Sequence, residues 1–473
     1  MTQKIKPINW GKLTVPYPSS DDANLVKSMF QQAIKYAVNK GYTDKYGVNT
    51  EGYIDFGNLN NRFIRHDIIR PPAMQALSIA TALKLGLYNE EIAEKSKADA
   101  LAICTKLVRS LAKCHKAAEP DIGWGIGWQD AWWAFAAGFA GWMTLEHYSP
   151  GDTEHIRQMV MMEADSFASI NRRGLYYRDK SGKIRTPGDT KAEENAWDSN
   201  IRHLARAMMP THIHRHIWEY DGLLLNISAY SAPMDLVSEK EVNGAKLRDW
   251  LEGTNAYDDG TVVNHDMIHP DYMASAVMNM LNGIVLTMGG LPTPEGIFHG
   301  IGRTYNALVN VDFDENYPLP EDVKDIGIHA PPVGMYGRNI YTYADAAKTI
   351  KSHKFYMPQG NDWGDVRQVT MGGFDGMISV FGCDATFTAE SAAKNRHVIV
   401  AAEWEKVHIT AAKAMQSRFD DGRMYADDEL TNFPPKEEQA CVELAMAVLA
   451  KWAVAQKDYR VTSEPPVLLS LLR

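Results

Sequence analysis

Three stretches of this chain share one pattern: ALKLGLYNEE at Ala82–Glu91, WMTLEHYSPG at Trp142–Gly151 and LARAMMP at Leu204–Pro210. In each, an apolar stretch typical of a helix ends at a short turn rich in Pro, Asn or Ser. A second, amphipathic stretch follows and predicts a helix that runs back beside the first. The repeated unit is therefore a helical hairpin.

The hairpins recur at a regular interval. The leucines near the end of each first helix, Leu85, Leu145 and Leu204, are about 60 residues apart. A fourth unit, Tyr272–Gly289, follows after an insertion. Because one hairpin cannot bury both of its faces, neighbouring hairpins must stack. We expect a mainly all-α protein, an (α/α) toroid of helical hairpins with long loops and at most one small β hairpin; the alternative is an ordinary helical bundle.

The repeat divides the chain into two parts. Residues 1–60 hold a proline-rich lead-in, a helix that runs from a cap at Ser20–Asp22 through Lys40, and a turn-rich segment. Residues 61–473 are expected to form the toroid as a single catalytic domain.

The last third of the chain is expected to close the domain with helices near Ala389–Ser417 and Pro435–Ala455. Strand signals are weak, and only Val366–Thr370 with Met377–Phe381 suggests a hairpin. The apolar stretch Ala131–Leu145 is shorter than the roughly 18–20 residues that span a bilayer, so it predicts a buried core helix.

Composition excludes several classes of protein. The 473 residues are 45% hydrophobic and 23% charged, which is ordinary for a globular protein. A net charge of −10 without a long basic run argues against nucleic-acid binding. The N-terminus shows no secretory signal, and the four cysteines form no CxxC pair. We expect a cytoplasmic protein that binds neither nucleic acid nor membrane; its oligomeric state stays open between monomer and homo-oligomer.

Long loops separate the predicted hairpins and hold most of the Gly, Trp, Asp, Asn and His residues. Loops of this length inside a compact domain are usually functional. They are Asp121–Asp130, Arg173–Asp189, Glu252–Pro270, Asn310–Arg338 and Met357–Gly376.

The first candidate motif is GWGIGWQDAWW at Gly123–Trp133. A Gly-rich loop here enters an apolar helix and presents several Trp residues. Aromatic faces stack on sugar rings, and Gln and Asp side chains bind hydroxyl groups, so a glycan site would use Trp124, Trp128, Gln129 and Asp130. The alternative is a Trp-rich layer of the core.

The second motif is GDTKAEENAWDSN at Gly188–Asn200. A helix N-terminus explains Glu193, because acids in the first turn are favoured by the helix dipole. Glu194 and Asp198 are four residues apart and share one helix face, where mutual repulsion suits acid–base chemistry. The residues that capping leaves unexplained are Glu194, Asn195, Trp197 and Asp198.

The third motif, DDGTVVNHDMIHPDY at Asp258–Tyr272, places Asn264, His265, His269 and Tyr272 together. Histidine exchanges protons near neutral pH, and a tyrosine beside it acts as a general acid or, with a lowered pKa, as a base. The two histidines are also spaced like metal ligands, so a divalent metal is the alternative to a site without cofactor. Packing and capping of the loop are the structural explanation.

Weaker signals complete the set. The loop Tyr356–Arg367 suits sugar contacts, although a tight turn explains it equally well. The run Asn60–Asp67 adds cations that could hold a carboxylate, and Thr211–His216 alternates three histidines; both favour a surface turn. The sugar-contact candidates of the first loop are Asn361, Asp362, Trp363 and Arg367.

The segment 259–272 resembles the Asp-Gly-Ser…Tyr/His stretch of the heparinase II/III-like and chondroitin-lyase-like toroid polysaccharide lyases. The helix start ENAW at 194–197 resembles the helix that supplies an Asn in those enzymes. The resemblance covers roughly residues 60–310 and implies an (α/α) toroid and a uronic-acid-containing glycan. It assigns Asn195 as the group that neutralises the uronate, His265 or His269 as the base or its helper, and Tyr272 as the base and acid.

The chain also departs from that pattern. Those lyases usually carry a large C-terminal β-sandwich and are usually exported, whereas the C-terminal third of this sequence reads as largely helical and no export signal is visible. Both features favour a cytoplasmic enzyme on imported oligosaccharides, or another reaction on the same scaffold.

Three functions follow in order. The first is β-elimination on a uronate-containing glycan, by a lyase without cofactor. The second is a glucuronidase-like glycoside hydrolase, which needs two carboxylates and would pair Glu194 with Asp130, Asp198, Asp259 or Asp362. The third is a glycan-binding protein without activity. Fold analogy does not separate the first two, because one toroid hosts both chemistries.

Overall fold

The computed structural model confirms the mainly helical class, with only two-stranded sheets among the residues it describes. No helix in this part of the chain combines the length and apolar character needed to cross a membrane. The described residues are 4–40, 47–59, 62–166, 174–178, 181–184, 188–265, 267–311, 340–341, 353–357, 361–393, 400–431, 433 and 435–472.

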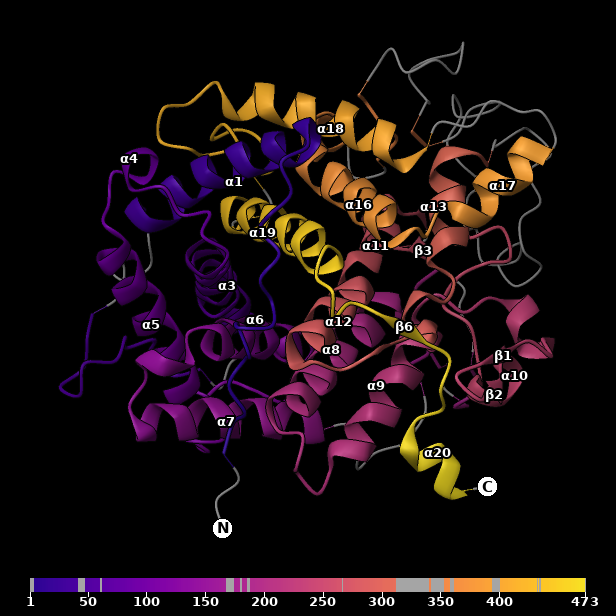
Figure 1. Ribbon diagram of the computed structural model, residues 1–473, viewed down its shortest axis with the longest axis horizontal. Helices are drawn as coiled ribbons and strands as arrows, with labels where there is room; N and C mark the ends of the chain where they lie inside the picture. Colours follow the sequence, from indigo (N-terminus) through magenta and orange to yellow (C-terminus); the bar gives the residue numbers. More distant parts are fainter. Residues whose placement is uncertain are drawn as a thin grey trace.

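Long, largely buried helices occupy the centre of the described part (Figure 1). Helix α3 packs on α6, α6 on α8, α8 on α12, and α12 on both α16 and α19; α19 also packs on α16 and on α3. Their bounds are α3 (Arg70–Lys84), α6 (Asp130–Met143), α8 (Ala192–Met208), α12 (Ala276–Gly289), α16 (Gln368–Phe381) and α19 (Lys436–Val454).

Helix α6 shows why these helices are central. Every one of its residues is buried, as the apolar stretch predicts. A Cβ at Gly138 would lie 2.5 Å from Val160 Cγ2, and one at Gly141 would lie 3.1 Å from Val108. The two glycines therefore let outer helices approach closely.

Amphipathic helices pack around the central ones. Helix α5 packs on α3 and α6, α7 on α6 and α8, α9 on α8, α18 on α16, and α1 on α19. Ser20, Ser96 and Ser149 accept hydrogen bonds from backbone N–H groups and cap three of these helices. Their bounds are α1 (Asp21–Asn39), α5 (Lys97–Lys113), α7 (Pro150–Asp165), α9 (Arg215–Ala229) and α18 (Ala401–Gln416).

Short elements connect these helices. The antiparallel pairs are β1–β2 and β3–β4, and β5 pairs with β6 in parallel. The elements are α2 (Arg62–Ile68), α4 (Glu90–Ala93), η1 (Leu145–His147), η2 (Pro233–Val237), β1 (Glu241–Val242), β2 (Ala245–Lys246), α10 (Leu247–Trp250), β3 (Val263–Asn264), β4 (Met267–Ile268), α11 (Pro270–Ala274), β5 (Thr293–Pro294), η3 (Glu295–Phe298), α13 (Ile301–Val309), α15 (Asn361–Val366), α17 (Ala385–Ala393), β6 (Val461–Thr462) and α20 (Val467–Leu472).

One prediction about secondary structure is wrong. The two proposed strands, Val366–Thr370 and Met377–Phe381, instead lie in the end of α15 and in helix α16, and the described part of the predicted loop Met357–Gly376 is largely helical from Asn361 on. Helix α16 packs on α18 and α19, and a Cβ at Gly372 would lie 2.7 Å from Ile409. These tertiary contacts override the local β propensity of its valines and isoleucine.

The C-terminal helices differ in detail from the prediction. The helix expected near Ala389–Ser417 is two helices, α17 and α18, whereas α19 matches the expected one and has Pro435 and Ala455 at its ends. One hydrophobic cluster reaches from Ile5 to Ala453, so α1 shares the core of the later helices. Most of the predicted loop Asn310–Arg338 lies outside the described residues.

Candidate active site

A cavity of about 280 Å³ lies where the N-terminal ends of several central helices meet. Helix N-termini carry partial positive charge, which favours anionic groups nearby. Charged and polar side chains from different helices line it together with Trp128 and apolar residues of α12, α16 and α19. The charged groups and the tyrosine that line it include Arg70, Glu193, Asp271, Tyr272, Arg367 and Glu443.

Arg367 is balanced by acids within this cavity. Its Nη2 atom lies 3.1 Å from Asp271 Oδ1 and 3.7 Å from Glu443 Oε1. Burial opposes the charge, but these two carboxylates raise the pKa of Arg367 above its usual value. Burial also raises the pKa of Glu443, and Arg367 counteracts that effect. The predicted sugar contact Arg367 thus serves first to fix Asp271.

Glu193 is half-buried on the same cavity wall. Burial, and then the charge of Glu194, raise its pKa well above that of an ordinary glutamate, against the opposing effect of Arg70. The raised pKa favours the protonated form of Glu193, a property that its favourable position at the helix dipole does not predict.

His265, His269 and Tyr272 come together as their spacing suggested. The hydroxyl of Tyr272 lies 3.4 Å from His265 Nε2, and the His269 ring meets the Tyr272 ring edge to face at 4.8 Å. His265 is exposed at the tip of the β3–β4 hairpin with a φ of 51°, a strained backbone for a residue other than glycine. Tyr272 forms part of the cavity wall.

The electrostatics of this cluster assign proton roles. Burial, followed by the charges of Glu193 and Glu194, raises the pKa of Tyr272 above its usual value, so its hydroxyl stays protonated. Burial lowers the pKa of His269 to about 4 and keeps its ring neutral. Tyr272 is therefore in the protonated form that a proton donor needs, and His269 is in the neutral form that a proton acceptor needs.

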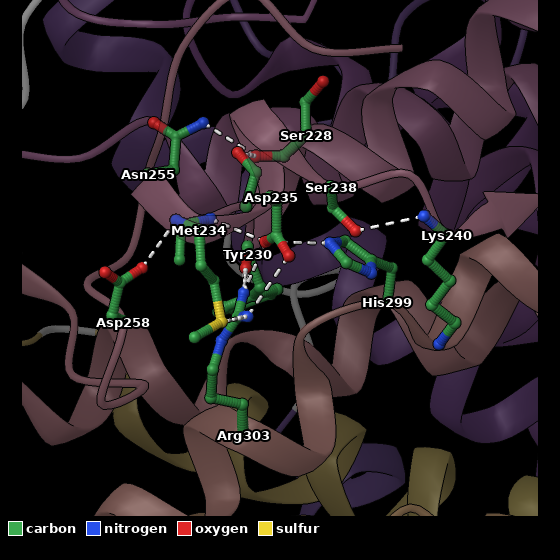
Figure 2. A network of polar contacts seen from close by, with 12 residues as sticks. Ser228, Tyr230, Met234, Asp235, Ser238, Lys240, Asn255, Asp258, His299 and Arg303 are labelled. Carbon is green, nitrogen blue, oxygen red and sulfur yellow. Dashed lines mark hydrogen bonds and ion pairs between the residues drawn. The ribbon is translucent and has the colours of Figure 1, made fainter. Parts of the chain in front are cut away.

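A network of polar contacts supports the loop before this hairpin (Figure 2). Asp235 accepts hydrogen bonds from Arg303 at 2.6 Å and His299 at 3.1 Å. Arg303 also donates to the carbonyl oxygen of Tyr230, whose hydroxyl in turn donates to the carbonyl oxygen of Tyr272. Gly260, with a φ of 91°, packs directly on the Arg303 carbonyl, which leaves no room for a side chain. The network thus holds the chain at Gly260, before the cluster of His265, His269 and Tyr272, and at Tyr272, where the cluster ends.

Asn195 does not lie in the cavity. It is fully buried, and its side-chain oxygen accepts from the Leu175 N–H while its nitrogen donates to the carbonyl oxygens of Leu175 and Lys191. Asn264 is similarly buried and accepts from the Thr190 N–H at 3.3 Å. Both amides hold backbone segments together, and Asn195 has no donor left for a substrate carboxylate.

The other helix α8 candidates are buried behind the cavity. Glu194 pairs with Lys191 at 2.5 Å, and burial raises its pKa. Burial raises the pKa of Asp198 to about 7, with Glu163 and Glu194 adding to the effect. Trp197 is buried and meets Trp128 edge to face at 6.4 Å.

The Gly-rich loop separates its four candidates. Trp128 is 57% exposed and lines the cavity with Gln129, whereas Trp124 is fully buried and donates its N–H to the Leu111 carbonyl oxygen. Asp130 is buried in an ion pair with Arg65 at 2.7 Å, and burial raises its pKa to about 6. Trp128 is therefore the aromatic platform of this loop, and Trp124 belongs to the core.

The remaining candidates lie at the edges of the described part. Asp259 accepts from the N–H and hydroxyl of Thr261 within a turn. Asn361, Asp362 and Trp363 begin α15, but their side chains lie outside the described residues. Among the described residues, no group of three or more His, Cys, Asp or Glu side chains is placed to hold a metal ion.

Comparisons of the chain with protein-family models, curated proteins and solved structures found no match. The site therefore has to be interpreted from its own geometry. Four residues of it, Arg70, Glu193, Asp271 and Glu443, are not among the site residues predicted from the sequence. Each is a charged residue in or next to the first turns of a helix that lines the cavity, where burial of a charge is costly unless the charge is paired.

Proposed function

We propose that the protein is an enzyme that cleaves a uronic-acid-containing glycan by β-elimination, on an (α/α) toroid. The fold part of the proposal is supported by the sequence of packed central helices, in which α19 contacts both α16 and α3. The position of the cavity at the N-terminal ends of these helices agrees with a site at one mouth of such a ring.

The contact between Tyr272 and His265 is the observation that carries the chemistry. In the proposed reaction, His265 Nε2 removes the C5 proton of the uronate, and the C5–H electrons form the C4–C5 double bond. The bond from C4 to the glycosidic oxygen breaks, and the Tyr272 hydroxyl protonates that oxygen. The proton then passes from His265 to the tyrosinate across their contact, which restores both groups.

An absorbance assay tests this reaction. Elimination creates a 4,5-unsaturated uronate that absorbs in the ultraviolet, so uronate-containing glycans are screened for rising absorbance. Tyr272→Phe and His265→Asn are each expected to slow the reaction by about 10²- to 10⁴-fold. Tyr53→Phe and His147→Asn, which lie outside the cavity, are the matched controls. Full activity in Tyr272→Phe would show that Tyr272 and His265 do not catalyse an elimination.

Hydrolysis is the second candidate because Glu193 and Asp271 stand in opposite environments. Glu193 has a raised pKa and suits a general acid, whereas Asp271 is ion-paired with Arg367 and suits a base or nucleophile. Hydrolysis yields a new reducing end without ultraviolet absorbance. Loss of activity in Glu193→Gln and Asp271→Asn together with full activity in Tyr272→Phe would establish it. Binding of glycans without any product leaves the third function, a glycan-binding protein.

A further inference from the structure

Arg70 differs from the other arginine of the cavity. It is the first residue of α3, and among the described residues no carboxylate lies within ion-pair distance of its guanidinium. Arg367, by contrast, is balanced by Asp271 and Glu443. Among the described residues, the cavity thus contains one arginine in ion pairs with acids and one that acids, Glu193 first, influence only from beyond ion-pair distance.

We propose that Arg70 is the receptor for the carboxylate of the substrate and selects an acidic sugar over a neutral one. The inference rests on the proposed function only for the identity of the ligand as a uronate. It gives Arg70 the neutralising role that the sequence resemblance assigned to Asn195.

The neighbours of Arg70 orient its charge without cancelling it. Its Nη1 donates to His66 Nε2 at 2.7 Å, and its Nη2 donates to Gln439 Oε1 at 2.9 Å. Because Nε2 of His66 accepts, the ring proton sits on Nδ1, which faces Asp67 at 3.1 Å. Burial and then Arg70 lower the pKa of His66, in agreement with a neutral ring. Both acceptors are therefore uncharged.

Unused donors remain on Arg70. A guanidinium has five N–H hydrogens, of which these contacts use two, and its buried Nε has no partner among the described residues. Burial lowers its pKa to about 10, so the group is still charged at neutral pH. A buried charge without a direct ion-pair partner is costly, and a ligand carboxylate would offset that cost with paired hydrogen bonds.

Binding measurements with simple sugars test Arg70 without relying on turnover. D-glucuronate, D-glucuronamide and D-glucose are titrated into the full-length protein by calorimetry. The wild type is expected to bind glucuronate about 10- to 100-fold more tightly than glucuronamide, which keeps the shape but lacks the charge. Arg70→Met is expected to abolish this preference and Arg70→Lys to keep part of it. Arg248→Met, at a surface arginine outside the cavity, is the control.

Equal binding of glucuronate and glucuronamide by the wild type, or no binding of glucuronate, overturns the proposal even if Arg70→Met does not fold. So does an unchanged preference in a folded Arg70→Met. The reaction can fail separately. If glucuronate is preferred in an Arg70-dependent way but no uronate glycan yields unsaturated product, Arg70 is the receptor and elimination is rejected. If wild type and Arg70→Met form unsaturated product equally well, elimination is supported and Arg70 is rejected as the receptor.

Discussion

His269 combines full burial with a lack of polar partners. Its ring nitrogens have no hydrogen-bond partner among the described residues, and burial lowers its pKa to about 4. A buried polar group without a partner costs about 1–3 kcal/mol. A residue held at that cost beside Tyr272 is better explained by a role in the site than by packing.

The pKa of His269 predicts how stability depends on pH. An unfolded histidine titrates near 6.5, so the unfolded chain binds more protons than the folded one between about pH 6.5 and 4. The contribution of neutral His269 to the free energy of unfolding is therefore complete above that pH window. It is lost as the pH falls through the window, by at most about 3 kcal/mol. Urea unfolding of His269→Gln should show a flatter pH dependence than the wild type. His147→Gln should not, and an unchanged slope in His269→Gln contradicts the assignment.

The local grouping of side chains could be predicted from the sequence more readily than their long-range contacts. The grouping of His265, His269 and Tyr272 follows from their spacing around a short hairpin, and the structure brings them together. Asn195 was misplaced because its partner is the Leu175 backbone, a long-range contact that no local pattern shows. Glu193, rather than Glu194, reaches the cavity because adjacent helix positions point about 100° apart, and the sequence does not fix the rotation of the helix.

The Gly123–Gln129 loop is held in shape by buried side chains that pack beneath it. Glu163 Oε1 accepts from the Ile126 N–H at 2.6 Å and from His115 Nε2 at 2.9 Å. Gly125 has a φ of 126°, and a Cβ there would clash with the His115 ring. This arrangement presents Trp128 to the cavity.

Gly125→Ala should therefore disturb both stability and binding. Backbone strain and the clash together are expected to cost about 3 kcal/mol in the free energy of unfolding. Gly86→Ala is the matched control, because Gly86 also has a positive φ but an added Cβ would contact nothing, so only about 1 kcal/mol is expected. Titration with a uronate oligosaccharide, followed by tryptophan fluorescence, should show weaker binding in Gly125→Ala only. Equal binding by both variants contradicts a role of the loop in presenting Trp128.

The Asp235 network is the second element that supports the site (Figure 2). Burial alone would raise the pKa of Asp235, but hydrogen bonds from His299 and Arg303 hold it well below its usual value. The contribution of ionised Asp235 to the free energy of unfolding is present above pH 3.8, the pKa of an unfolded aspartate, and is lost as the pH falls below that value. Asp235→Asn should cost about 3–5 kcal/mol at pH 7, because Arg303 loses its counterion.

Thermal melts at pH 7 and pH 3 measure this effect. The difference between wild type and Asp235→Asn should be large at pH 7 and smaller at pH 3. Asp249→Asn, at an exposed acid near the surface arginine Arg248, should change neither. A difference that is the same at both pH values would show that the charge of Asp235 is not what matters.

The elements themselves were largely predictable where the local signal is strong: a cap and an amphipathic pattern in α1, a continuous apolar stretch in α6, and a long apolar pattern after Pro435 in α19. Helix α16 was not, because short apolar runs separated by glycines read equally well as strands. Only its burial between α18 and α19 decides the matter, and that is a property of the assembled protein.

At the scale of the whole molecule, the N-terminal lead-in ties distant helices together. The Lys6 N–H donates to the Met208 carbonyl oxygen at 2.8 Å, and the Lys6 carbonyl oxygen accepts from the Trp142 indole at 2.7 Å. Further along, Gln456 just beyond α19 accepts from the Val15 N–H and donates to its carbonyl oxygen. The lead-in therefore fastens the last central helix to α6 and α8, although its sequence predicts a segment separate from the toroid domain.

Gln456→Ala tests whether this fastening stabilises the arrangement of the central helices. The change removes the two hydrogen bonds that Gln456 forms with the backbone of the half-buried Val15, which should cost about 1–3 kcal/mol in the free energy of unfolding. Gln158→Ala, on the outer helix α7, removes one hydrogen bond to Glu154 and should cost much less. If the lead-in only covers a finished core, hydrogen exchange in Gln456→Ala should rise at residues 4–20 alone. If it holds the first and last central helices as neighbours, exchange should also rise along α19 and α3, and glycan binding at the cavity between them should weaken.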